Sequence, residues 1–217
     1  MSASQDNTVN RLRIFGKASS INVRKVLWTC AEIGIRYDRE DWGDGFASTN
    51  TPEFLALNPN GLVPVIEDEA GVLWESNTIC RYLGSKHKRV DLIPTLPRDR
   101  ALVERWMDWQ ATDLNGSWRY AFMAIVRAHP AFTDAEQVEQ SLRSWNAKMG
   151  ILERQLCGTN SYVVGPTFCL ADVVIGLSVN RWLMTPFTRP DYPAVLAYHK
   201  RLLSRPGFVK HGCNGLP

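Results

Sequence analysis

Apolar residues before about residue 90 follow two periods, one typical of strands and one typical of helices. Short runs rich in β-branched residues alternate with segments whose apolar positions recur every three to four residues. This alternation predicts a small α/β unit. The expected order is a strand at 11–15, a helix at 23–34, a strand at 35–40, a short helix at 51–57, a hairpin of 62–68 and 71–74, and a helix at 76–87.

The first helix has the clearest pattern, because its apolar residues share one face and Gly34 can end it in a left-handed conformation. The segment before it, GKASSINV (16–23), offers polar side chains for the N-cap or the first turn. A serine before a helix is more often a cap than a catalytic group, and both interpretations stay open on the pattern alone. The apolar stripe consists of Val23, Val26, Leu27, Cys30 and Ala31, and the polar candidates are Ser19, Ser20 and Asn22.

The later part of the chain is helical almost throughout. Long amphipathic segments cover 98–128 and 133–157, an apolar helix is expected near 170–184, and shorter helices near 192–204. The stretch RVDLIPTLPR contains two prolines and has no clear period, so we expect it to be a linker. The predicted organisation is an α/β domain at 10–87, a linker at 88–97 and an all-helical domain at 98–217.

Composition places the chain among ordinary globular proteins. It has 217 residues, of which 45% are hydrophobic and 22% charged, so it can bury a sizeable core. The formal net charge is only +3 and no long basic run occurs, which argues against a nucleic-acid partner. The first ten residues lack the apolar region of a signal peptide, and no apolar stretch is long enough to span a bilayer. We therefore expect a cytoplasmic protein without a membrane partner.

The five cysteines indicate neither a disulfide framework nor a metal site. They are scattered, odd in number and free of the CxxC or Cys/His spacing of zinc ligands. Small buried or half-buried hydrophobic side chains are their expected role, and no metal is expected. The residues are Cys30, Cys80, Cys157, Cys169 and Cys213.

Two further stretches suggest a binding site. In NPNGLVPVI (58–66), Pro64 stands where an apolar run should enter a sheet, although proline has no N–H for a strand ladder. It is either an edge proline in a trans turn or the cis proline of a tight turn. In ESNTICRYL (75–83), Ser76 or Asn77 can cap a helix, and the same helix end can bind an anion.

Taken together, the motifs SINVRKVL, NPNGLVPV, LWESNTICRYL and RWMDW resemble the cytosolic glutathione S-transferases, in particular the bacterial theta-like type with a Ser-x-Asn turn at the first helix. The resemblance covers essentially the whole chain. It implies a thioredoxin-like N-terminal domain, a helical C-terminal domain, glutathione as co-substrate, a small electrophile as the other substrate, and a homodimer.

The resemblance also implies where glutathione binds. The Val63–Pro64 bond would be cis, with Pro64 beginning the third strand and the Val63 main chain pairing with the cysteinyl part of glutathione. The Ser76 hydroxyl and N–H would bind the γ-glutamyl carboxylate, and Glu75 would face its ammonium group.

One position departs from the family pattern. Many relatives have Lys or Arg before the Val-Pro pair, where it binds the glycyl carboxylate, but this chain has Leu62. Lys17, Asn60 or another residue would have to replace that contact.

The expected chemistry is stabilisation of the glutathione thiolate, because a thiol has an ordinary pKa of about 8.5 and the anion is the nucleophile. The resemblance makes Ser20 the first choice for the hydrogen-bond donor to sulfur, Ser19 the second, and Asn22 a second donor or orienting group. Neither a metal nor a redox cofactor is required.

We expect the helical domain to supply the electrophile pocket, with Trp118, Arg119 and Tyr120 as its residues, since Gly116 could open the helix toward the cleft. The stretch FCLADVVIG matches the family's capping box, with Cys169 in place of Ser or Thr and Asp172 as the acceptor.

Three classes of function remain open. The first is a glutathione transferase that conjugates or dehalogenates a small electrophile. The second is a glutathione-dependent isomerase or thiol–disulfide enzyme, although its redox form normally needs a cysteine at the first helix and none lies in 16–23. The third is a noncatalytic glutathione-binding member, which the fold alone does not exclude.

Overall fold

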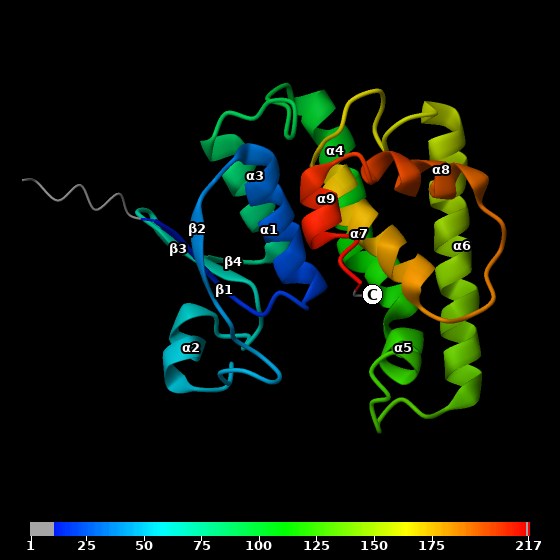
Figure 1. The fold of residues 1–217 in the computed structure, drawn as a ribbon, viewed down its shortest axis with the longest axis horizontal. Coiled ribbons are helices and arrows are strands. Elements are labelled where there is room, and N and C mark those ends of the chain that lie inside the picture. The colour runs from blue at the N-terminus through cyan, green and yellow to red at the C-terminus, as the bar shows by residue number, and fades with distance from the viewer. Residues whose placement is uncertain (1–10, 216) are drawn as a thin grey trace, which may run out of the picture.

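The computed structural model describes residues 11–215 and 217. The chain forms two side-by-side units, a small sheet with its helices and a larger group of helices (Figure 1). The predicted α/β plus all-α fold is confirmed. The boundaries at 10–87, 88–97 and 98–217 stay a prediction, and residue 10 lies outside the described residues.

The sheet has four strands in the order β2-β1-β3-β4. Strand β1 runs parallel to β2 and antiparallel to β3, and β3 and β4 form the predicted hairpin. Ile14 pairs with Ile66 at the centre, where both side chains are fully buried. The strands are β1 (Leu12–Phe15), β2 (Tyr37–Glu40), β3 (Val65–Asp68) and β4 (Gly71–Trp74).

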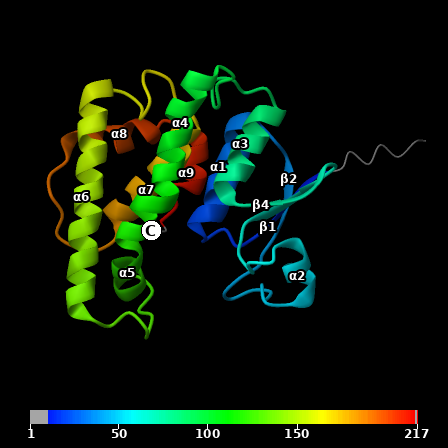
Figure 2. The ribbon, with the colours of Figure 1, turned by 180° about the vertical axis from the view of Figure 1, so that it is seen from behind.

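Helices α1 (Ile21–Ile33) and α3 (Ser76–Lys86) lie between the sheet and the larger group of helices (Figures 1 and 2). The predicted apolar positions of α1 are buried except Ala31, which is exposed. The helix is buried on its other faces as well, where Arg24, Lys25 and Trp28 lie, because it is packed between the sheet and the helical unit. Gly34 ends the helix at φ 85°, as its position predicts. Helix α2 (Pro52–Leu57) packs elsewhere, in a small separate core formed by Phe15, Phe54 and Val65.

The helical unit surrounds α7 (Leu170–Met184), which is buried on nearly every side. The segment predicted as one long helix is instead α4 (Pro97–Trp109), a π-helical turn (Gln110–Leu114) and α5 (Asn115–Ile125). Helix α9 was not predicted, since the expected short helices ended near residue 204. The others are α6 (Ala135–Thr159), α8 (Pro193–Leu202) and α9 (Pro206–His211).

Asp172 joins α7 to its surroundings. Its carboxylate accepts hydrogen bonds from the N–H groups of Cys169 and Val163, both at 2.9 Å, and from the Tyr198 hydroxyl at 3.1 Å. Burial raises the pKa of Asp172 to about 6, while these donors favour the anion. The predicted role of Asp172 as a capping residue is therefore supported by its contacts.

We expect Asp172→Ala to lower the free energy of unfolding by about 3–5 kcal/mol, because it leaves several buried donors unpaired. The matched control is Asp134→Ala, which removes an exposed cap of α6 and should cost about 1 kcal/mol. Urea unfolding of both variants measures the difference. Equal losses would contradict the role assigned to Asp172.

A buried lysine connects the two units. Lys25 Nζ donates to Asn77 Oδ1 of α3 at 3.1 Å and to Gln110 Oε1 of the π-helical turn at 2.7 Å. Burial lowers the pKa of Lys25 to about 8. Three elements thus meet at one cation whose hydrogen-bond acceptors are uncharged amides.

This burial predicts a pH-dependent stability. Since the ordinary pKa is 10.5 and the folded-state pKa is about 8, the unfolded chain binds the proton more strongly. The contribution of Lys25 to the free energy of unfolding should therefore rise between pH 8 and 10.5. Lys25→Met should remove this increase in denaturant titrations across that range. An unchanged pH dependence in Lys25→Met would show that Lys25 is not the group responsible.

Candidate active site

A cavity of about 750 Å³ opens at the amino end of α1. Ser20 and Ile21 line one side of it, and residues of the π-helical turn and α5 line the other. Arg181 of α7 contributes from the helical core. The cavity therefore lies between the sheet unit and the helical unit.

Ser20 is the N-cap residue of α1. Its N–H donates to the Lys17 carbonyl at 3.1 Å, and its own carbonyl accepts from Arg24 N–H at 2.9 Å. Within the described residues, the Ser20 side chain makes no capping hydrogen bond. The hydroxyl group is thus free to donate to a ligand beside the amino end of the helix. Ser19 and Asn22 are half-buried and are not among the residues that line the cavity.

Gly16 allows the serine turn to approach the Val63 turn closely. Its φ is +148°, and a Cβ there would lie 2.6 Å from Val23 Cγ2 and 3.0 Å from Val63 Cβ. Any larger residue would push these segments apart. Because Gly16 has no side chain, Val63 can lie next to the amino end of α1.

The turn before β3 is held by Asn58. Its Nδ2 donates to the Leu62 carbonyl at 2.8 Å, and its Oδ1 accepts from the Asn60 N–H and side-chain amide at 3.1 and 2.9 Å. The Val63–Pro64 bond is cis, as predicted. Pro64 does not begin the strand, however, because β3 starts at Val65, the first residue that has an N–H to pair.

The entrance to α3 differs slightly from the expectation. The N-cap is Glu75, which has a positive φ of 74°, and not Ser76 or Asn77. Ser76 is the first helical residue and is buried, whereas Glu75 is exposed. The first turn of α3 still offers N–H groups and the Ser76 hydroxyl to an anion.

The predicted electrophile residues separate into two groups. Trp118 and Arg119 line the cavity with Ser20. Tyr120 does not, because its hydroxyl accepts from Asp134 N–H at 3.2 Å and it lines a different hollow toward α6. Two residues along a helix span about 200°, so Tyr120 points to the side of α5 opposite Trp118. Gly116 does not open the helix either, since α5 continues through it.

Among the basic residues of the cavity, Lys17 was named from the sequence only as a possible contact for the glycyl carboxylate, and Arg127 and Arg181 were not assigned a role. Lys17 Nζ donates to the carboxylate and the carbonyl of Asp44, both at 3.1 Å, and this contact lowers the pKa of Asp44. Arg127 follows α5, and Arg181 lies on α7. In the sequence, Arg181 stands out as a basic residue in a mostly apolar helix, but the sequence does not indicate which residues surround it.

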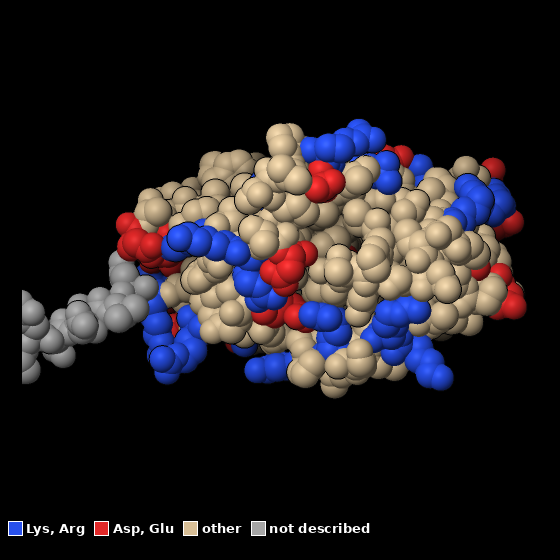
Figure 3. Space-filling view, turned by 90° about the horizontal axis from the view of Figure 1, so that it is seen from above, with Lys and Arg blue, Asp and Glu red and all other residues tan. Residues whose placement is uncertain are grey.

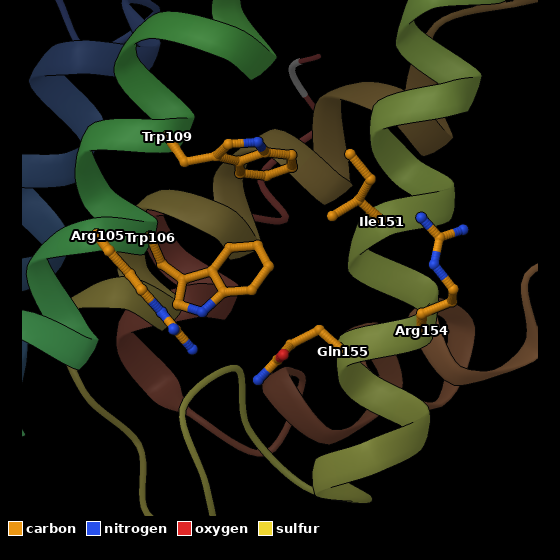
Figure 4. A pocket seen from close by; sticks show the side chains of 6 residues that line it. All are labelled: Arg105, Trp106, Trp109, Ile151, Arg154 and Gln155. Atoms are coloured by element: carbon orange, nitrogen blue, oxygen red, sulfur yellow. The ribbon is translucent and has the colours of Figure 1, made fainter.

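A second hollow, of about 530 Å³, lies between α4 and α6. Figure 4 shows Trp106 and Trp109 of α4 facing Ile151 and Gln155 of α6, with arginines at both sides. None of the residues predicted for the active site lines it. The cavity at Ser20 is therefore the candidate active site.

The cysteines mostly have the expected role. Cys30, Cys80 and Cys169 are buried, and burial raises the pKa of each thiol. Cys157 is an exception because it is exposed.

In the described part of the chain, no three His, Cys, Asp or Glu side chains are grouped to hold a metal, and no helix is long and apolar enough to cross a membrane. On one face, Lys and Arg are scattered among acidic and uncharged residues (Figure 3).

Comparisons with known proteins define the family. The profile of the glutathione S-transferase N-terminal domain matches residues 19–86, and that of the C-terminal domain matches residues 118–206. Glutathione S-transferase GstB of Escherichia coli (strain K12) is 31% identical over 201 residues, which cover 92% of this chain and 96% of that protein. The chain belongs to the glutathione S-transferase family, and its sheet unit is the thioredoxin-like domain of that family.

A solved structure and a longer relative add detail. The theta class glutathione S-transferase from Xanthomonas axonopodis pv. citri, with glutathione bound, is 35% identical and has a TM-score of 0.86 over 96% of this chain and 100% of that chain. Elongation factor 1-gamma 3 of Oryza sativa subsp. japonica is 30% identical over 196 residues, but the match spans only 45% of its length.

Proposed function

We propose that this protein is a glutathione S-transferase in which Ser20 stabilises the thiolate of glutathione for attack on a small electrophile. The observation that supports it best is the Ser20 hydroxyl, which has no capping role within the described residues and opens onto a cavity. The amino end of α1 adds a favourable dipole at the same place. The family comparisons support the same reaction.

The reaction needs only a modest stabilisation of the glutathione thiolate relative to the thiol. Each unit by which the thiol pKa falls corresponds to about 1.4 kcal/mol of preference for the anion. One charge-assisted hydrogen bond from Ser20, together with the helix dipole, provides roughly two units. The thiolate sulfur then bonds to the electrophilic carbon, and the displaced group leaves with its electron pair.

Glutathione itself would bind along the sheet edge and the entrance of α3. Val63 would pair with the cysteinyl main chain, Ser76 would hold the γ-glutamyl carboxylate, and Glu75 would face the ammonium group. Lys17 and Asn60 are weaker candidates for the glycyl carboxylate, since Lys17 pairs with Asp44 and Asn60 with Asn58.

We also propose the bacterial theta-like subclass with a Ser-x-Asn turn, a cytoplasmic location and a role in detoxification. The 35% identity to the theta class structure supports the subclass. A thiol–disulfide enzyme is less well supported, because Cys30 lies buried inside α1 and not at its amino end. The similarity to elongation factor 1-gamma 3 keeps the noncatalytic class as an alternative, but the match spans only 45% of that protein.

Family resemblance predicts a homodimer. Sedimentation velocity at micromolar protein should give one species of twice the chain mass, because dimers with two-fold symmetry are the commonest closed assembly. A species that stays monomeric over that concentration range would rule the prediction out.

Ser76→Ala should weaken glutathione binding by about 1–3 kcal/mol, the cost of losing a hydrogen bond to a charged group. Titration calorimetry of the wild-type protein and the variant measures it. Ser85→Ala, near the other end of α3, is the matched control and should bind as the wild type does. Unchanged affinity in a folded Ser76→Ala protein would refute the assignment.

Ser20→Ala should lower turnover at neutral pH by about ten- to a thousandfold, because the bound thiol loses its donor. Glutathione affinity should change little, and part of the rate should return as pH rises. Turnover against pH with a neutral electrophile measures the effect, and Ser19→Ala is the control with a smaller expected loss. If Ser19→Ala or Asn22→Ala shifts the profile and Ser20→Ala does not, the donor has been misassigned.

A further inference from the structure

The cavity at Ser20 carries an excess of positive charge. Lys17, Arg119, Arg127 and Arg181 line it, and Asp44 is the one carboxylate side chain among its lining residues, all of which are described. Asp44 is already paired with Lys17 at 3.1 Å. Lys17 and, to a smaller extent, Arg127 lower the pKa of Asp44, so a single carboxylate side chain faces four cations among the lining residues, and neither Arg119 nor Arg181 forms an ion pair with it.

Arg181 is the most unusual of the three. It is only 3% exposed, and none of the described Asp and Glu side chains forms an ion pair with it. Its guanidinium carbon lies 4.0 Å from the Phe122 ring centroid and 4.5 Å from that of Trp118. Burial, together with Arg24 and Arg127, lowers the pKa of Arg181. A buried cation is costly unless an anion or strong acceptor completes its surroundings, and two aromatic faces offset only part of that cost.

One oxygen acceptor already lies beside this cluster. Arg24 Nη2 donates to the Pro217 main-chain oxygen at 2.8 Å, and Arg181 Nη2 lies 3.5 Å from the same oxygen. The contact of Arg181 is long for a hydrogen bond, and Arg24 holds the shared oxygen more closely. The Arg181 guanidinium can therefore donate to a closer, negatively charged partner in the cavity.

The remaining lining limits what that partner can be. Trp118, Phe122 and Met123 give the cavity an apolar wall next to the arginines. A ligand that matches both features has an apolar body and one anionic end. The planar guanidinium fork fits a carboxylate especially well.

We propose that the electrophile of this enzyme carries a carboxylate, which Arg181 and Arg127 bind while its apolar body lies against Trp118 and Phe122. This inference rests on the proposed transferase function. Arg181 and Arg127 are specificity-determining residues in this account, and Ser20 stabilises the attacking sulfur from the opposite side of the cavity.

The probes are 4-chloro-3-nitrobenzoate, which carries a carboxylate, and 4-chloro-3-nitrobenzamide, which carries an uncharged amide in the same position. With either probe, the glutathione sulfur bonds to the ring carbon that bears chlorine, chloride leaves with the electron pair, and the thiol proton passes to solvent. Each kcat/KM is divided by the uncatalysed rate constant, which removes the difference in intrinsic reactivity. The acid-to-amide ratio of these values then reports charge recognition.

We expect the wild-type enzyme to favour the acid. Arg181→Met and Arg127→Met should each lower the acid-to-amide ratio by about ten- to a hundredfold, the effect of losing a charge-assisted hydrogen bond. Arg181→Met should fold, because it replaces a buried cation that lacks a carboxylate side-chain partner by an apolar side chain of similar length. Arg127 is exposed and follows the end of α5, outside the core, so its variant tests the inference independently. Arg154→Met, from the hollow in Figure 4, is the control and should keep the wild-type ratio.

Calorimetry with glutathione alone shows whether the two arginines bind glutathione or the electrophile. The Kd of glutathione should change less than about twofold in Arg181→Met and Arg127→Met, well below the effect of losing a charged contact. A large loss of glutathione affinity would mean that the arginines bind its glycyl carboxylate, and would overturn the inference. A wild-type preference for the amide, or turnover of 1-chloro-2,4-dinitrobenzene with neither probe accepted, would also overturn it. Absence of both glutathione binding and turnover of any electrophile would instead reject the transferase function.

Discussion

Burial of α1 between the sheet and the helical unit is the constraint on which the rest of the structure depends. Trp28 of α1 reaches Phe168 and Phe208, with ring centroids 5.7 and 5.0 Å away. The indole also needs Gly207, because a Cβ there would lie 2.5 Å from Trp28 Cδ1. Packing of this kind fixes the helix along its length. Its amino end meets the cavity, which is where we propose that Ser20 stabilises the thiolate.

The same helix contacts both the elements proposed to bind glutathione and those proposed to bind the electrophile. At its start, Gly16 lets Val63 approach the serine turn, and farther along Lys25 joins Asn77 of α3 to Gln110 of the π-helical turn. Arg24, on the same helix, lies close enough to Arg181 to lower its pKa. In the proposed mechanism, the position of α1 therefore sets both the place of the thiolate and the charge of the pocket that the thiolate faces.

Periodicity and motifs predicted most of the fold. The strands, α1, α3 and α7 have strong patterns, and the cis bond at Pro64 followed from family resemblance. Other features depend on contacts that a linear pattern does not contain. The π-helical turn at Gln110 interrupts a continuous amphipathic segment, and the short helix α9 packs against α1, which is far from it in sequence.

The site shows the same division. The family resemblance singled out Ser20 from Ser19 and Asn22, and the structure places Ser20 on the cavity, although its role as thiolate donor stays a prediction. Tyr120 was assigned to the pocket although α5 turns it toward Asp134. The surroundings of Arg181 come from α1, α5 and the C-terminal segment, so its burial beside Trp118 could not be predicted from neighbours in sequence.

The central claim is that the sulfur of glutathione lies at the amino end of α1 and accepts a hydrogen bond from Ser20. The most direct test is a crystal structure of the wild-type protein with glutathione bound. The account predicts the sulfur within hydrogen-bond reach of Ser20 Oγ, facing the cavity lined by Trp118 and Arg181, with the cysteinyl main chain paired to Val63. Glutathione bound with its sulfur away from Ser20, in contact with Ser19, Asn22 or no hydroxyl donor, would contradict it.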